Sequence, residues 1–279
     1  MSKKLLLFVA LAANANASET TSVSHFSELS IDAASPTGVF QRGQGGRAAV
    51  GIGAELESEY HGSAKRITEL MPYIELSYRS KRWEFQSNIM NNRVIYQLNN
   101  AWYVASWLNL EEGREAAEAS DNSLDGMGDI DDMFEVGAGV SWRATDDFTL
   151  NLMVQGYAGG DPDKGMVGFI FAHYRILRTD SWKVDLSADL SFADSKHLTT
   201  EFGVTPQQSK TSAYEVYEID NGLKSIGVGI NSVYALNKNI LISLNADYEL
   251  LLSDSADSPL IKAGSDIEIE AGASVIYRF

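Results

Sequence analysis

The sequence of 279 residues contains no cysteine and only 5 prolines, and its 22 Lys and Arg are outnumbered by 38 Asp and Glu. Without cysteine, the chain has neither disulfides nor thiol catalysis. The net charge of -16 disfavours nucleic-acid binding, because no basic patch offsets it. The four histidines, His25, His61, His173 and His197, are too scattered for the ligand spacing of a zinc site. We therefore expect no metal, no cofactor and no nucleic acid among the ligands.

The sequence also lacks an apolar segment long enough to cross a bilayer as a helix. The short apolar segment 5–13 follows two lysines and precedes the small residues Ala15 and Ala17. This order predicts a secretory signal peptide over residues 1–17, cleaved after Ala17. The polar residues 18–46 then predict a flexible periplasmic segment. Export leaves two classes open, a soluble periplasmic protein and an outer-membrane barrel.

Alternation of apolar and polar residues is the dominant pattern of the chain. In 266–279, DIEIEAGASVIYRF, the apolar and aromatic residues fall on one face and the acidic residues on the other, as in a strand. The stretches 239–252, 182–194 and 147–158 repeat this pattern. A soluble β-sandwich also alternates. These stretches are, however, roughly twice the usual strand length of about 5–6 residues, which favours tilted strands that cross a membrane.

The connections between these stretches alternate between short and long, as the periplasmic turns and extracellular loops of outer-membrane barrels do. The long connections lie near 111–132, 158–165, 194–221 and 252–265. The sequence thus predicts an all-β fold, a transmembrane antiparallel β-barrel over residues 47–279 with about twelve strands. If 82–98 does not form two strands, about ten remain. The expected strands are 47–58, 68–79, 82–90, 93–98, 101–110, 133–144, 147–158, 166–178, 182–194, 222–236, 239–252 and 265–279.

Aromatic residues gather beside the short turns. Amphipathic rings prefer the headgroup level of a bilayer, so we interpret four tryptophans as an interface girdle; in a sandwich they would be core residues instead. The last strand closes on Tyr277 and Phe279, which share the parity of its apolar face. This ending resembles the C-terminal signature of bacterial outer-membrane proteins, and we expect Tyr277 and Phe279 to form the assembly signal. The girdle tryptophans are Trp83, Trp102, Trp142 and Trp182.

No motif in the sequence indicates catalysis. The acidic stretch 125–135 lacks the ligand spacing of a calcium-binding loop, and no nucleophile, base and acid stand in a recognisable arrangement. We therefore expect no enzyme activity. The faces predicted to point inward carry both signs of charge, with an acidic excess. They suit either a polar lumen joined by ion pairs or a narrow channel that favours cations.

Several segments resemble the MipA/OmpV outer-membrane family. They are AVGIGAELESEYHGS (49–63), LMPYIELSYR (70–79), GMGDIDDMFEVGAGVSWR (126–143), EFGVTPQQS (201–209) and the C-terminal stretch 222–279. The loops FGVTP and DSADSPL are the most specific. The resemblance covers about residues 47–279.

The resemblance implies a Gram-negative outer-membrane barrel in contact with lipid. It further implies a non-catalytic scaffold associated with peptidoglycan-remodelling enzymes, a lytic transglycosylase and a murein synthase. Two other hypotheses remain open: a narrow diffusion pore or binder of small molecules such as antibiotics, and a surface adhesin acting through the loops 111–132 and 194–221.

Overall fold

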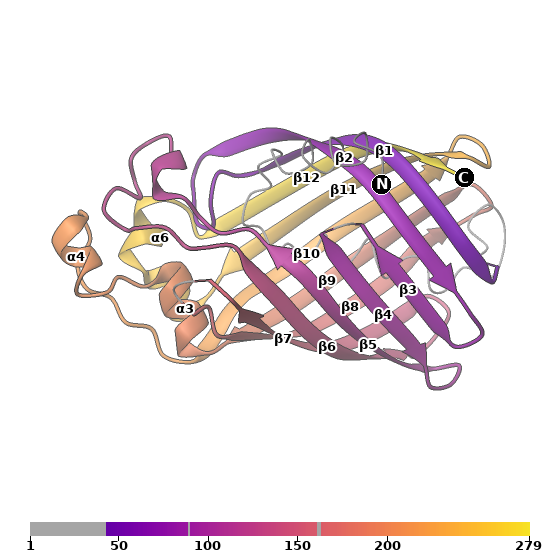
Figure 1. Ribbon diagram of the computed structural model, residues 1–279, viewed down its shortest axis with the longest axis horizontal. Coiled ribbons are helices and arrows are strands. Elements are labelled where there is room, and N and C mark those ends of the chain that lie inside the picture. The colour runs from indigo at the N-terminus through magenta and orange to yellow at the C-terminus, as the bar shows by residue number, and fades with distance from the viewer. Residues whose placement is uncertain (1–42, 89, 161–162) are drawn as a thin grey trace, which may run out of the picture.

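The computed structural model describes residues 43–88, 90–160 and 163–279. They form a closed antiparallel barrel of twelve strands, each paired with its neighbours in sequence, and β1 pairs with β12 to close the ring (Figure 1). The backbone N–H of Phe279 donates to the carbonyl of Ala48 (2.9 Å) at this seam. The strands are β1 Gly45–Ser58, β2 Arg66–Arg79, β3 Trp83–Ser87, β4 Asn91–Gln97, β5 Trp102–Glu111, β6 Met133–Arg143, β7 Phe148–Ala158, β8 Met166–Arg178, β9 Trp182–Ala193, β10 Gly222–Ala235, β11 Ile240–Leu251 and β12 Ile267–Arg278.

The prediction of an antiparallel barrel with about twelve strands is confirmed. The doubtful region 82–98 forms two strands, β3 and β4. The count of ten is therefore wrong. The predicted signal peptide, with Ala15 and Ala17, lies outside the described residues, as does most of the predicted segment 18–46.

The barrel is apolar outside and charged inside, the reverse of a soluble protein. On the outer face, Leu70 is 72% exposed and Ile52 is 61% exposed, whereas the lumen-facing Lys183 and Glu135 are 0% and 1% exposed. Because buried charges need polar partners and exposed apolar bands need lipid, this inversion excludes the soluble sandwich. Within the described residues, no helix is both long and apolar enough to cross a membrane.

Glycines on the lumen face make room for large neighbours on the next strand. Gly137 lies opposite Trp107, and a Cβ at Gly137 would fall 2.0 Å from a ring atom of that indole. A Cβ at Gly227 would fall 2.2 Å from a carboxylate oxygen of Asp189 on β9. These strand glycines relieve crowding where a side chain lies flat against the wall.

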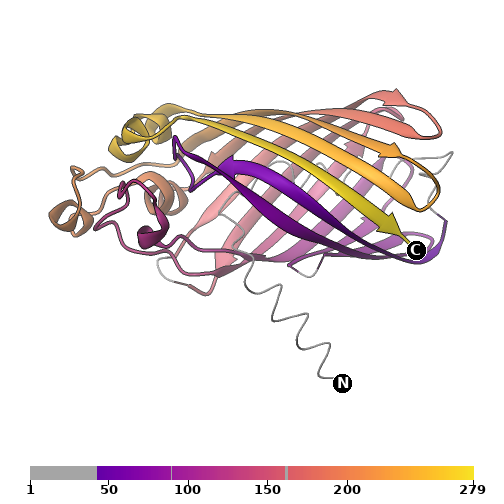
Figure 2. The same ribbon diagram turned by 90° about the horizontal axis from the view of Figure 1, so that it is seen from above.

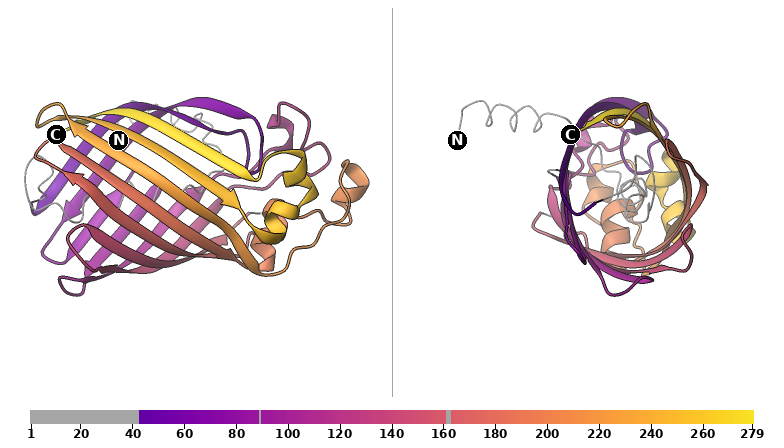
Figure 3. Two further views of the ribbon diagram at one scale, coloured as in Figure 1. Left: turned by 180° about the vertical axis from the view of Figure 1, so that it is seen from behind. Right: turned by 90° about the vertical axis from the view of Figure 1, so that its right-hand side faces the viewer.

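The long loops at one end of the barrel fold together into a cap. The cap contains η3 Ala116–Glu118, α3 Ser195–Phe202, α4 Gln208–Thr211, α5 Ser253–Asp257 and α6 Pro259–Ala263. In the end-on view of Figure 3, seen from the short-turn end, cap helices overlap the ring of strands. Figure 2 shows the cap at the end opposite to the C-terminus.

Two apolar clusters stabilise the cap. One joins Leu198 and Phe202 of α3 to Ile261 of α6, and the other joins Tyr60 to Leu124 and Leu260. Burial of each such side chain contributes about 1.5–3 kcal/mol. The cap is thus a packed layer built from loops that are far apart in the sequence.

Candidate functional site: the lumen beneath the cap

Carboxylates from four strands, β9, β11, β12 and β1, concentrate on one wall of the lumen. The strand register sets Asp247 of β11 opposite Glu270 of β12, and Glu249 opposite Glu268. Alternation of side chains then directs these residues to the same face. We call this set the acidic wall. It consists of Glu55, Glu57, Asp189, Asp247, Glu249, Glu268 and Glu270.

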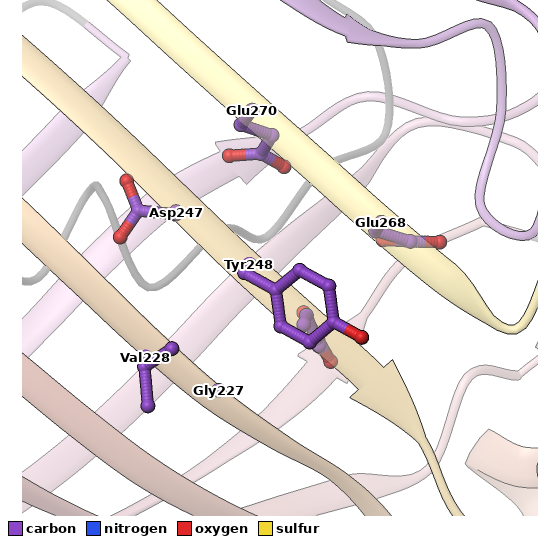
Figure 4. Close-up of a pocket in the computed structure, with 7 residues that line it drawn as sticks. Gly227, Val228, Asp247, Tyr248, Glu268 and Glu270 are labelled. Carbon is purple, nitrogen blue, oxygen red and sulfur yellow. The ribbon is translucent and has the colours of Figure 1, made fainter.

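A small pocket lies in the acidic wall. Figure 4 shows Asp247 of β11 and Glu268 and Glu270 of β12 around it. Gly227 and Glu249 also line it. The missing side chain at Gly227 leaves the space that Asp189 occupies from the other side. The pocket therefore presents several carboxylates and few opposite charges, a lining that suits a cationic group.

The upper part of the acidic wall bonds directly to the cap. The backbone N–H of Gly62 donates to Glu268 Oε1 (2.7 Å), and His61 Nε2 lies 3.4 Å from the same oxygen. Lys224 Nζ lies 4.0 Å from Glu249 Oε1. The side chain of Lys224 is buried. The loop between β1 and β2 therefore lies against the carboxylates of β12.

A buried ion cluster joins the cap to the opposite side of the barrel. Lys164 Nζ lies 2.7 Å from Glu201 Oε1 on α3 and 3.1 Å from Glu111 Oε1 on β5. It also lies 5.1 Å from the ring centre of Tyr157. Burial alone would raise the pKa of Glu201, but the charge of Lys164, followed by His197 and His61, holds that pKa below its ordinary value. Glu201 therefore stays ionised beneath the cap.

His197 stays neutral at physiological pH. Burial and, next, the positive charge of Lys224 lower the pKa of His197 to about 3. Its ring stacks on Tyr157 at 5.6 Å. Within the described residues, neither ring nitrogen makes a hydrogen bond of normal geometry, although the Lys164 backbone lies close enough to favour the protonated form slightly. Burial likewise lowers the pKa of His61 well below its usual value.

The predicted girdle residues lie at the short-turn end, on the outer face. Trp83, Trp102, Trp142 and Trp182 are 55%, 42%, 41% and 44% exposed, respectively. Trp102 and Trp142 stack at 6.1 Å across β5 and β6. The contact of each with headgroups stays a prediction.

The predicted assembly residues, Tyr277 and Phe279, share that outer face and end of the barrel. Their rings meet edge to face at 5.1 Å, and Phe279 is 71% exposed. The role of this pair in assembly stays a prediction.

Sequence reasoning placed the acidic residues of β9, β11 and β12 on the inner face but missed the ion cluster. Lys164, His197 and Glu201 come from two loops that no pattern linked. One local signal was present: Asp194 precedes α3 and its carboxylate accepts from the His197 amide (2.9 Å), as an N-cap does. It predicts a helix in that loop, although not its partners.

The family described as MltA-interacting protein MipA matches residues 50–279. The chain belongs to this family. With its closed barrel, membership places the protein in the outer membrane. No curated protein matches the chain.

Solved structures similar to this family member are outer-membrane barrels. The translocator domain of autotransporter NalP from Neisseria meningitidis matches with a TM-score of 0.46 and 10% identity, covering 92% of this chain and 96% of that chain. The KdgM porin matches with a TM-score of 0.42 and 12% identity, covering 83% of this chain and 99% of that chain. With both TM-scores below 0.5, the assignment of the fold rests on the strand pairing of the chain itself.

Proposed function

We propose that this protein is a non-catalytic outer-membrane scaffold that binds peptidoglycan-remodelling enzymes, a lytic transglycosylase and a murein synthase among them. The observation that supports the proposal is the family match over residues 50–279, whose description names an MltA-interacting protein. In the predicted orientation the cap faces outward, so the periplasmic partners meet the short-turn end.

The short-turn end offers charged side chains to such a partner. Lys81 and Arg82 are exposed in the turn between β2 and β3, while Asp146 and Asp180 are exposed in two other turns. Rim charges of this kind mainly govern association rate and salt dependence. We therefore expect a micromolar-range complex that weakens with added salt.

Binding of a purified lytic transglycosylase to the barrel in detergent tests the scaffold. The double variant Lys81→Glu/Arg82→Glu should weaken binding, whereas Lys210→Glu, on the exposed surface of α4, should leave it unchanged. Absence of binding by the wild-type protein over the micromolar range would remove the scaffold function.

The acidic wall favours a second candidate function, passage or binding of a cationic solute. Its carboxylates line a pocket and would repel anions. In planar bilayers, we expect a small conductance that prefers cations, reduced in Asp247→Asn/Glu270→Gln and unchanged in the turn variant Asp180→Asn. A barrel that conducts nothing and binds no cationic solute would contradict this second function.

The adhesin hypothesis stays a prediction. The two loops it invokes contact each other: Thr211 Oγ1 donates to the Gly126 carbonyl (2.6 Å), and Gln208 Nε2 donates to the Met127 carbonyl (2.7 Å).

A further inference from the structure

Among the described residues, β2 extends well beyond its neighbour β3 toward the cap. β3 and β4 contain only 5 and 7 residues, whereas β2 contains 14. β1 pairs with β2 along its whole length, but β3 pairs with β2 only at Leu76–Arg79. Figure 1 shows the short β3 and β4 beside the longer β2. The cap-proximal part of β2, residues 66–75, therefore has a far edge without a neighbouring strand in the described part of the chain.

The hydrogen-bond pattern shows which backbone groups face that edge. Ser80 N donates to Trp83 O on the β3 side, and Glu59 N donates to Lys65 O on the β1 side. Because bonding directions alternate along an antiparallel strand, the even-numbered residues of β2 direct their backbone groups away from β1. Above β3, the edge groups of four residues face no strand among the described residues: Thr68, Leu70, Pro72 and Ile74.

Two sets of hydrogen bonds bound this unpaired stretch of the β2 edge. Below it, the tip of the β3–β4 hairpin is closed by Asn88 N, which donates to Asn91 O (3.0 Å). Above it, the loop that follows β5 crosses to the loop between β1 and β2: Lys65 Nζ donates to Ser120 Oγ (2.8 Å), and Ser120 N donates to Glu59 Oε1 (3.1 Å). We call this unpaired stretch of the β2 edge, residues 66–75, the lateral window.

The lateral window brings lipid and polar backbone together. Its outer rim is apolar, with Leu70 and Leu76 72% and 52% exposed. Backbone groups of an open edge are tolerated at membrane depth only where they line protein or a water-filled cavity. The edge of β2 therefore needs a polar partner from the lumen side, while the rim needs an apolar one.

Pro72 disfavours a partner strand at this edge. It lies in the centre of the open stretch and directs its ring nitrogen, which carries no hydrogen, toward the window. A strand added there would lose a ladder bond in the middle, and proline on an edge strand is a known means of preventing such pairing. An amphiphile needs no continuous ladder of hydrogen bonds. Its polar head can bond to the β2 edge while its apolar tail contacts the rim.

We propose that the lateral window is a portal through which a single-chain amphiphile moves between the bilayer and the lumen. The acidic wall selects an uncharged or cationic head group, because an anionic head would meet like charges there. The apolar tail lies along the rim and the head reaches the lumen. This proposal is independent of the scaffold function.

Cysteine labelling can test the portal cleanly, because the natural sequence contains no cysteine. A small fluorophore on Met71→Cys reports on the lumen face beside the window, and the same label on Ser243→Cys reports on the lumen face of the continuous wall formed by β10, β11 and β12. Leu70→Cys, on the lipid face, is the positive control. Each labelled barrel is placed in vesicles that contain phospholipids brominated on their acyl chains.

We expect strong quenching at position 70, clear quenching at position 71 and little at position 243. Equal quenching at positions 71 and 243 would overturn the portal. Deleting residues 18–42 should leave the quenching at position 71 unchanged. If quenching appears only after that deletion, this segment occupies the window and the proposal is wrong.

Head-group selection is tested with two single-chain nitroxide amphiphiles that differ only in a quaternary ammonium or a sulfate head. For each amphiphile, the concentration that gives half-maximal quenching at position 71 is divided by the concentration that does so at position 70. We expect this ratio to be about tenfold lower for the cationic amphiphile than for the sulfate. Tenfold corresponds to about 1.4 kcal/mol. Equal ratios for the two amphiphiles would overturn the selection by the acidic wall.

Discussion

Acid should loosen the cap through His197. The folded protein holds the pKa of this buried histidine at about 3, chiefly because burial disfavours the charged ring and next because of Lys224. An exposed histidine has a pKa of about 6.5. Between pH 6.5 and 3, the open cap therefore binds more protons than the closed cap. The stability of the closed cap rises with pH across this range.

The magnitude follows from linkage. At pH 5, an exposed histidine lies about 1.5 units below its pKa, so protonation of the open state favours opening by about 2 kcal/mol, or roughly 30-fold. The groups around His197 include Lys224, Lys164, Glu201 and His61. Glu201 stays ionised in this range because its pKa is lowered, and thus does not cancel the effect.

Hydrogen exchange of peptides from α3, corrected for intrinsic rates, measures this opening. We expect the protection free energy of residues 195–202 to fall between pH 8 and 5, with about 2 kcal/mol of that fall due to His197. His61, which packs against Phe202 and whose pKa is also lowered by burial, adds to the fall. In His197→Phe, which keeps a ring against Tyr157, the fall should be about 2 kcal/mol smaller than in the wild-type protein. Exchange of β9 provides an internal reference. Equal protection at both pH values, or an equal fall in His197→Phe, would refute the linkage to this histidine.

Three further perturbations have defined outcomes. Lys164→Met leaves Glu201 buried without its cation and should destabilise the cap by about 3–5 kcal/mol. The double variant with Glu201→Leu should recover most of that loss in the same exchange assay. No recovery would mean that the pair is not coupled. Gly137→Val places side-chain atoms where the Trp107 ring lies and should lower the yield of heat-modifiable barrel, and a normal yield would contradict the need for space there. Deletion of Phe279 should reduce outer-membrane assembly without changing secretion, and full assembly would exclude the predicted signal.

The barrel was predictable because each strand carries its own pattern. β6 and β9, for example, begin at Met133 and Trp182 and end within one residue of the predicted limits. A lipid-facing strand must alternate over its whole length, and its end is marked by a charged or amide-rich turn. The inner position of the acidic residues followed from the same alternation, but their gathering on one wall depends on the register between strands.

The cap was beyond sequence patterns because its contacts join distant segments. Ser258 Oγ donates to the Phe202 carbonyl, and Tyr214 OH donates to the Ser123 carbonyl (2.8 Å), which are 56 and 91 residues apart in the chain. No periodicity relates such positions. The lateral window, in contrast, left two signals in the sequence: the short region 82–98 and Pro72 inside an otherwise regular strand.

The cap and the lateral window differ in how easily a molecule could enter the lumen through them. Buried apolar clusters fill the cap, and the Lys164–Glu201 pair fixes α3 above the lumen. A solute that approaches from outside would therefore have to displace packed side chains, whereas an amphiphile in the bilayer would meet the unpaired edge of β2 beyond the β3–β4 hairpin. Because protonation of His197 loosens the cap and leaves the β2 edge unchanged, lowering the pH should increase passage through the capped end without altering lateral access at position 71.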